Sequence, residues 1–251
     1  MSEIIFARPR HNYASYTDFW ELVKLAKFPI IYQDEIDPTT ENTYIFTGAD
    51  AHVSFPEGKA RVIYWLLEWY GDYVQKPGVT ETWCSNVTFS DMLGLRYVPM
   101  GSHPGLGTID RLPLKHDITH LSYSDVHRRR LLYDRFLLQG FSIAPNGWGN
   151  ERDEVLRSTR LMIHVHQNGQ FPGIAPLRLS LGAAYGLPVV AENGWSSEPY
   201  GNTIIHSAYR GFEQVVRRTL QNYSQIEYLG EQLHTLLCYD LEFGRVVRAH
   251  V

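Results

Sequence analysis

The sequence predicts an α/β fold made of two parallel-sheet domains that face each other across a cleft. Short β-rich runs alternate with helical stretches along the chain, and these runs are almost continuously apolar. Such alternation is typical of βαβ units, and continuous apolar runs indicate strands that are covered on both faces. A third observation is a segment rich in glycine and proline at residues 100–113, which separates two alternating halves and predicts a hinge.

The chain therefore divides into an N-terminal domain of residues 1–104, a C-terminal domain of residues 105–224 and a helical segment of residues 225–251. In the first half we expect strands at residues 4–7, 30–33, 43–47, 62–67 and 97–100, and helices at 16–26 and 87–93. In the second half we expect strands at residues 118–122, 141–144, 161–166 and 188–191, and helices at 124–139, 151–159 and 177–185. Ligands of such sheets bind at the carboxyl ends of the strands, so the loops that follow strands are the places to search.

Composition narrows the class of protein. Of the 251 residues, 44% are hydrophobic and 20% charged, which is ordinary for a globular protein. The formal net charge of -4 argues against a general nucleic-acid binder. Cys84 and Cys238 match neither a disulfide framework nor a zinc-site spacing, and the N-terminus lacks a signal pattern. We therefore expect a cytoplasmic protein without a membrane span.

Several classes of chemistry lack their motifs. The chain has no HExxH, no phosphate-binding G-x-x-x-x-G-K-[ST] and no G-x-S-x-G elbow, and the glycines at 105 and 107 lack the setting of a dinucleotide fingerprint. We expect His164 and His166 to point to opposite faces of their strand and so not to share a metal. Neither a metal nor a resident cofactor is expected.

The most informative segment is residues 161–193. A buried strand ends at His166, and a helix then begins near Pro176 with Arg178 in its first turn. Gly186 suits the end of that helix. A helix N-terminus offers free N–H groups and a positive dipole end, and an arginine beside it can bind phosphate oxygens in a bidentate way. From spacing alone, an ordinary βαβ crossover with one solvated arginine is the favoured explanation.

This segment resembles the donor-binding region of GT-B glycosyltransferases, especially the branch related to the spore-maturation CgeB proteins and to family 4, the glycosyl transferases group 1. The residues that match the pattern of that branch are His166, Arg178, Gly186 and Pro188. Residues 121–149 resemble the first βαβ unit of the same domain. The resemblance covers residues 118–193 well and the N-terminal half only in strand order. It implies a compact GT-B fold of two Rossmann-like domains, a nucleotide-diphosphate sugar as co-substrate and no divalent ion.

The resemblance also implies roles for individual residues. Family 4 transferases usually carry two glutamates where this chain has Gly173 and Leu181, so ribose recognition has to come from elsewhere, with Glu192 or Glu198 as candidates. A solvated surface is the alternative explanation for the arginines at 128–130. The candidates for the donor diphosphate are Arg178, Arg128, Arg129 and His166, and those for the nucleotide and ribose are Glu192, Asn146 and Trp148.

Candidates on the acceptor side follow strands of the N-terminal half. Asp50 and His52 lie in a loop that resembles the histidine-bearing loop facing the transferred sugar in several GT-B enzymes. Either could act as general base in an inverting enzyme, or position the substrates in a retaining one. A turn-capping aspartate and a surface histidine remain the alternative. The further acceptor-side candidates are Arg8, Arg10 and His11, whose basic loop hints at an anionic acceptor, together with Glu68 and His103.

The sequence thus predicts a hexosyltransferase-like enzyme that moves a sugar from a UDP- or GDP-sugar to a carbohydrate or other hydroxyl acceptor. By analogy with the branch, we expect retention of configuration, independence of metal and closure about residues 101–107. One alternative is a non-catalytic nucleotide- or sugar-binding protein with a degenerate site. Another is a phage-type transferase that acts on a modified DNA base, which the net charge disfavours.

Overall fold

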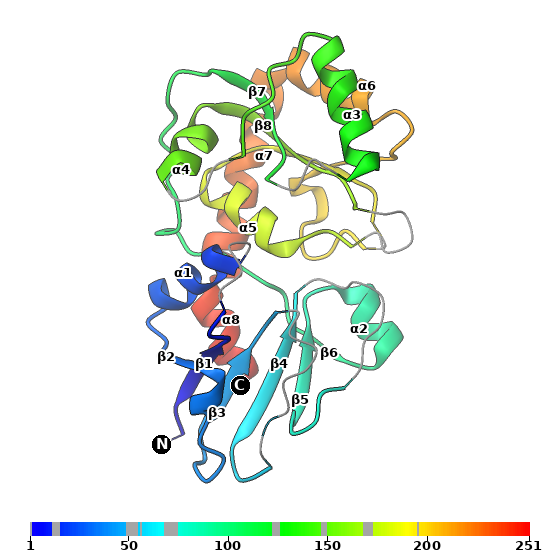
Figure 1. Ribbon diagram of the computed structural model, residues 1–251. Coiled ribbons are helices and arrows are strands. Elements are labelled where there is room, and N and C mark those ends of the chain that lie inside the picture. The colour runs from blue at the N-terminus through cyan, green and yellow to red at the C-terminus, as the bar shows by residue number, and fades with distance from the viewer. Residues whose placement is uncertain are drawn as a thin grey trace.

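The computed structural model describes residues 2–11, 16–48, 55, 57–67, 75–121, 126–146, 150–167, 173–194 and 196–251. The described chain forms two lobes, one above the other in Figure 1, and each lobe contains one sheet whose strand pairs are all parallel. This arrangement confirms the α/β prediction. Among the described residues, no helix combines the length and the apolar character that crossing a membrane requires.

The N-terminal sheet has the strand order β2-β1-β3-β4-β5-β6. Its last two strands differ from the expected elements. β5 was not predicted, because a run of four residues that begins with Glu81 gives little signal. β6 holds two residues instead of the expected 97–100, because the chain turns from there toward the other lobe. The elements are β1 (Ile4–Arg8), α1 (Thr17–Leu25), β2 (Ile30–Tyr32), η2 (Gln33–Glu35), β3 (Thr43–Phe46), β4 (Arg61–Leu66), β5 (Glu81–Cys84), α2 (Val87–Leu93) and β6 (Arg96–Tyr97).

The C-terminal sheet has the strand order β10-β9-β8-β7. The strand expected at residues 141–144 is wrong: only an isolated bridge between Ile118 and Ile143 forms there, and Pro145 two residues later has no N–H to extend the ladder. β10 and α6 were not predicted. The elements are β7 (His116–Thr119), α3 (His127–Leu138), α4 (Asn150–Arg157), β8 (Thr159–His164), α5 (Pro176–Ala184), β9 (Val189–Glu192), η3 (Gly201–Thr203), β10 (Ile205–Ser207) and α6 (Phe212–Gln221).

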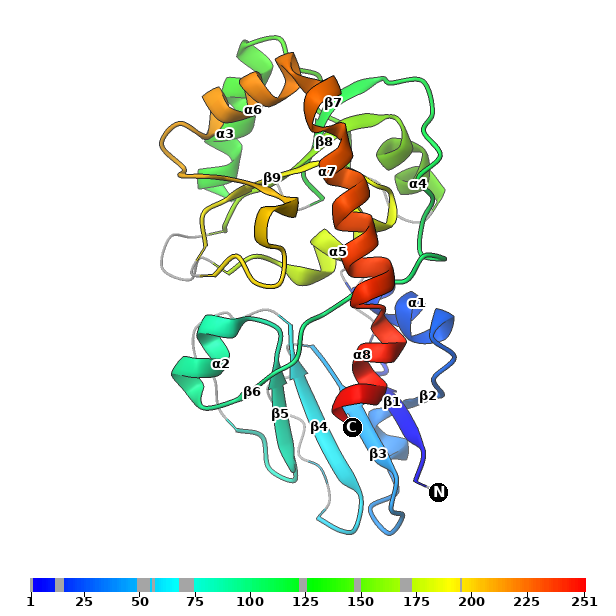
Figure 2. The same ribbon diagram turned by 180° about the vertical axis from the view of Figure 1, so that it is seen from behind.

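The C-terminal segment runs along one side of the molecule from the upper to the lower lobe, as Figure 2 shows. It consists of α7 (Tyr223–Thr235), the π-helix η4 (Leu236–Asp240) and α8 (Phe243–His250). Phe243 of α8 packs against the N-terminal lobe, with its ring centroid 5.9 Å from that of Phe6 and 5.7 Å from those of Phe19 and Trp65. The end of the chain therefore belongs, by its packing, to the N-terminal lobe.

The two lobes share a hydrophobic core and a buried ion pair. One cluster of buried side chains includes Phe6 and Trp65 from the N-terminal sheet and Leu177 and Val189 from the C-terminal lobe. Asp18 of α1 pairs with Arg152 of α4, and both side chains are less than 10% exposed. Burial raises the pKa of Asp18, against the effect of Arg152. Contacts of this kind hold the two lobes together.

The linker between the lobes is fixed at its start. Ser102 Oγ donates to the Ser180 carbonyl at 2.9 Å, and Ser180 Oγ donates to the Gly101 carbonyl at 2.6 Å. The Ser102 N–H donates to the Leu237 carbonyl of η4 at 2.8 Å, and a Cβ on Gly101 would lie 1.5 Å from the Leu241 oxygen. Gly101 and Ser102 are therefore bonded to α5 and η4, and the closure expected about residues 101–107 stays a prediction.

Candidate functional site

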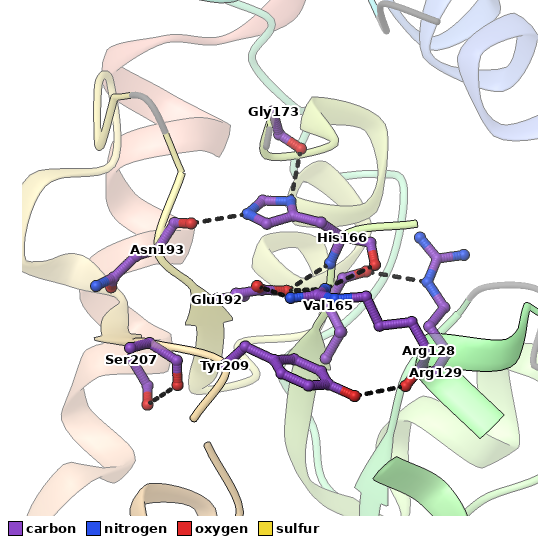
Figure 3. Close-up of polar contacts among 10 residues, drawn as sticks. Arg128, Arg129, Val165, His166, Gly173, Glu192, Asn193, Ser207 and Tyr209 are labelled. Carbon is purple, nitrogen blue, oxygen red and sulfur yellow. Dashed lines mark hydrogen bonds and ion pairs between the residues drawn. The ribbon is translucent and has the colours of Figure 1, made fainter. Parts of the chain in front are cut away.

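The residues expected at the donor gather at the carboxyl edge of the C-terminal sheet. His166 follows the end of β8, Glu192 is the last residue of β9, and Arg128 lies at the start of α3 (Figure 3). Arg178 lies in the first turn of α5, the helix that follows β8. The structure therefore brings these four residues into one region, although their contacts differ from those expected.

Arg128 and Glu192 are partners of each other. The two guanidinium Nη atoms donate to the two carboxylate oxygens, and Arg128 Nη1 also donates to the His166 carbonyl at 3.1 Å. The His166 N–H donates to Glu192 Oε2 at 3.0 Å. The guanidinium lies 3.7 Å from the centroid of the Tyr209 ring, a cation–π contact. Both Glu192 oxygens thus accept hydrogen bonds from Arg128, and the expected roles of the two residues at the diphosphate and the ribose stay predictions.

Arg129 is buried at the same edge of the sheet. Only 3% of the residue is exposed, and its Nε donates to the Val165 carbonyl at 3.0 Å. A buried guanidinium is poorly exposed to a diphosphate outside the sheet, and the expected ligand role of Arg129 stays a prediction. Sequence analysis could not separate it from Arg128, because adjacent residues at a helix start carry the same local signal.

His164 and His166 lie on the same side of their strand. Their rings meet edge to face with centroids 5.4 Å apart, so the expectation of opposite faces is wrong. Side chains two positions apart along a strand point to the same face, and only adjacent residues alternate. Burial, together with the charge of Arg178, lowers the pKa of His164 well below its ordinary value. In the described ranges no group of three potential metal ligands occurs.

Arg178 combines a charge with an uncapped helix N-terminus. Pro176 occupies the start of α5, and Ala175, which precedes it, provides no side-chain cap. Arg178 is half-buried and its Nη1 lies 3.4 Å from His164 Nδ1. Within the part of the chain that the structure describes, no carboxylate forms an ion pair with it. The first turn of α5 therefore presents a positive charge and free N–H groups, an arrangement that attracts anions.

Neither Gly173 nor Leu181 can replace the glutamates that family 4 transferases usually carry at these two positions. Leu181 is 4% exposed and packs in the shared core. A Cβ on Gly173 would lie 3.3 Å from the Phe89 ring and 3.8 Å from the Asn86 amide nitrogen, both in the N-terminal lobe. The start of α2 thus approaches the loop before α5. No pattern in the sequence indicates this approach, since Asn86 looks like an ordinary cap of α2. Its side chain accepts the Phe89 N–H at 3.1 Å.

On the N-terminal lobe, two of the acceptor-side arginines meet at Tyr32. The guanidinium carbon lies 5.0 Å from the Tyr32 ring centroid for Arg8 and 4.4 Å for Arg10. Arg8 also donates to the Tyr32 hydroxyl at 3.1 Å, while Arg10 forms an ion pair with Asp34 at 2.8 Å. His11 is exposed. His103 does not join them: its Nδ1 accepts the Gly105 N–H at 3.0 Å within a turn.

Four of the expected site residues, Asp50, His52, Glu68 and Trp148, lie outside the described residues. Their roles stay predictions. The strands that lead to the first three, β3 and β4, are central in the N-terminal sheet and end at the same edge as Arg8. Asn146 is exposed beyond the bridge at Ile143.

Solved structures with the same architecture include glycosyltransferases of the GT-B fold. AviGT4, a glycosyltransferase involved in Avilamycin A biosynthesis, aligns over 100% of this chain and 99% of its own with a TM-score of 0.59 and 10% identity. WaaG, a glycosyltransferase involved in lipopolysaccharide biosynthesis, aligns over 98% of both chains with a TM-score of 0.60 and 9% identity. TarM gives a TM-score of 0.51 at 7% identity over 87% of this chain and 55% of its own. The predicted two-domain GT-B fold is confirmed.

Sequence comparison adds a distant relative. Uncharacterized protein L140 of Acanthamoeba polyphaga mimivirus is 26% identical over 142 residues, which are 52% of this chain and 45% of that protein. The chain thus spans less than half the length of this curated relative. No protein-family model matches the sequence. The resemblance to the CgeB-related branch stays a prediction.

Proposed function

We propose that the protein is a glycosyltransferase that moves a sugar from a nucleotide-diphosphate sugar to an acceptor hydroxyl. The observation that carries this proposal is Arg178, a half-buried arginine with no carboxylate partner in the described chain, at the uncapped start of α5 and at the carboxyl edge of the C-terminal sheet. Ligands of open parallel sheets bind at this edge. The GT-B fold supports the proposal by analogy.

The proposed chemistry follows from these charges. When the bond between sugar and diphosphate breaks, negative charge grows on the leaving phosphate. Arg178 and the N–H groups of α5 stabilise that charge, which lowers the barrier without a divalent ion. Asp50 or His52 positions the acceptor hydroxyl, whose oxygen forms the new bond to the sugar as the bond to the diphosphate breaks. We assign retention of configuration, a UDP- or GDP-sugar donor and a carbohydrate or other hydroxyl acceptor, with Arg8 available to an anionic group.

A second candidate function is binding of a nucleotide or sugar without catalysis. Gly173 and Leu181 favour it, because neither can form the hydrogen bonds that the two family glutamates supply. Slow hydrolysis of the donor without an acceptor separates the two functions: a transferase hydrolyses the bound nucleotide sugar slowly, and a binding protein leaves it intact.

The proposal is tested by titrating the protein with UDP-glucose, GDP-glucose, ADP-glucose and dTDP-glucose in a calorimeter. We expect one of them to bind, and Arg178→Ala to weaken that binding about 10- to 100-fold, since a charged hydrogen bond contributes roughly 1.5–3 kcal/mol. The matched control is Arg218→Ala, which removes an exposed arginine of α6 and leaves affinity unchanged. Equal affinity of Arg178→Ala and the unmodified protein would remove the proposed phosphate site.

A further inference from the structure

His166 lies between two carbonyl oxygens that only a doubly protonated imidazole satisfies together. Its Nδ1 is 3.2 Å from the Gly173 oxygen and its Nε2 is 3.0 Å from the Asn193 oxygen, as Figure 3 shows. A carbonyl oxygen only accepts hydrogen bonds, and a neutral imidazole carries a single N–H. In the neutral ring, therefore, one ring nitrogen carries no proton and faces a carbonyl oxygen, so that two hydrogen-bond acceptors meet.

The surroundings of His166 oppose a second proton in the free protein. The residue is 2% exposed, and burial lowers the pKa of its ring. Arg128 of α3 acts in the same direction, whereas Glu192 of β9 and the two carbonyl groups raise the pKa. The ring of His164, the last residue of β8, meets the His166 ring edge to face. The pKa of His164 is itself lowered well below its ordinary value. At neutral pH the ring is thus held mostly neutral, with one of its two contacts unsatisfied.

An anion at α5 changes this balance. Arg178 forms no ion pair with a carboxylate of the described residues, and its Nη1 lies 3.4 Å from His164 Nδ1. The His164 ring in turn touches that of His166. A diphosphate bound to Arg178 would neutralise the charge of Arg178. It would also place negative charge beyond the His164 ring, which lies between Arg178 and His166. Negative charge at such a distance favours the imidazolium, and the two carbonyl groups are already in place to accept its N–H groups.

We infer that His166 takes up a proton from solution when a nucleotide-diphosphate sugar binds at Arg178, and that the imidazolium then donates to both Gly173 and Asn193. His166 is a positioning residue in this role: it fixes the backbone after β9 to the backbone before α5, and it does not touch the ligand. The inference rests on the proposed function, because it takes the donor diphosphate as the anion.

The direction of the pH dependence follows from the linkage. Since the anion raises the pKa of His166, donor affinity rises as the pH falls through the pKa of the complex. The affinity levels off below the lower pKa of the free protein, where both states carry the proton. A neutral residue at position 166 removes this dependence, whatever it does to stability.

The test is calorimetry of the nucleotide sugar that binds, in buffers of equal pH but different ionisation enthalpy, between about pH 5 and pH 8. The diphosphate diester of a nucleotide sugar has no proton to exchange near neutral pH, so the buffer dependence reports protons bound by the protein. We expect uptake of up to one proton. We expect none in His166→Gln, whose affinity becomes independent of pH. The matched control, His164→Gln, changes the neighbouring buried histidine and keeps the uptake.

The outcomes separate the inference from the proposed function. Binding without proton uptake overturns the inference and leaves the donor site standing, as does uptake that survives in His166→Gln. Absence of binding by every nucleotide sugar overturns both. If His166→Gln fails to fold, NMR of the unmodified protein with ¹⁵N-labelled histidine decides instead. Both ring nitrogens of His166 should move to imidazolium shifts when the ligand is added, and a ring that stays neutral contradicts the inference.

Discussion

Arg128 and Glu192 lie 64 positions apart in the chain and form a two-bonded ion pair across the carboxyl edge of the C-terminal sheet. The pair joins α3 to β9 and receives the His166 N–H, so it fixes the ends of two strands and one helix relative to each other. Arg178, at the same edge, forms no ion pair with a carboxylate among the described residues.

The first prediction concerns this pair. Arg128→Ala should lower the free energy of unfolding by about 3–5 kcal/mol, because it leaves the carboxylate of Glu192, a side chain 7% exposed, without a counter-charge. Urea denaturation measures the loss. Adding Glu192→Leu should recover most of it. If Arg128→Ala weakened nucleotide binding and left stability intact, Arg128 would be a ligand residue after all.

The second prediction concerns the linker. Gly101→Ala should strongly destabilise the protein, because the new Cβ would lie 1.5 Å from the backbone oxygen of Leu241 and neither backbone can move freely. Gly105→Ala is the matched control, since its Cβ would meet only flexible side-chain atoms at 3.2 Å or more. Soluble yield and the urea midpoint compare the two. Equal soluble yields and urea midpoints of the two variants would show that the backbone near Gly101 shifts to make room for a Cβ.

The third prediction is a loss of stability in acid through His164. Because the pKa of His164 is lowered in the folded protein, the unfolded chain binds the proton first. Stability from this group is present above its unfolded pKa of about 6.5 and falls by up to about 1.4 kcal/mol per pH unit below it. Denaturation midpoints along a pH series should decline less steeply in His164→Gln than in the unmodified protein. An identical pH dependence of the midpoint in both proteins would show that groups other than His164 cause the loss of stability in acid.

The fourth prediction separates the acceptor side from the donor side. Asp50→Ala and His52→Ala should each reduce sugar transfer while leaving the affinity for the nucleotide sugar nearly unchanged, because both residues follow a strand of the lobe opposite Arg178. Calorimetry and a transfer assay on the same preparations measure the two effects. A loss of nucleotide affinity would assign these residues to the donor pocket instead.

Local patterns in the sequence determined the class of fold and the helix at the candidate site. The continuous apolar runs correspond to parallel strands, because a strand that is buried on both faces needs apolar residues at nearly every position. Pro176 and Gly186 predicted where α5 begins and ends, since a fixed φ suits the first turn and the φ of 61° at Gly186 favours glycine. The position of Arg178 in the first turn followed from the same signals.

Tertiary structure alone decided which of these residues remain available to a ligand. Glu192 and Arg128 are both plausible ligand residues in the sequence, and only the meeting of β9 with α3 shows that they bind each other. The contact between Gly173 and the start of α2 and the return of α8 to the N-terminal lobe depend in the same way on segments far apart in the chain. Local preference fixes the conformation of a segment, whereas the partners of a charge depend on which segments pack together.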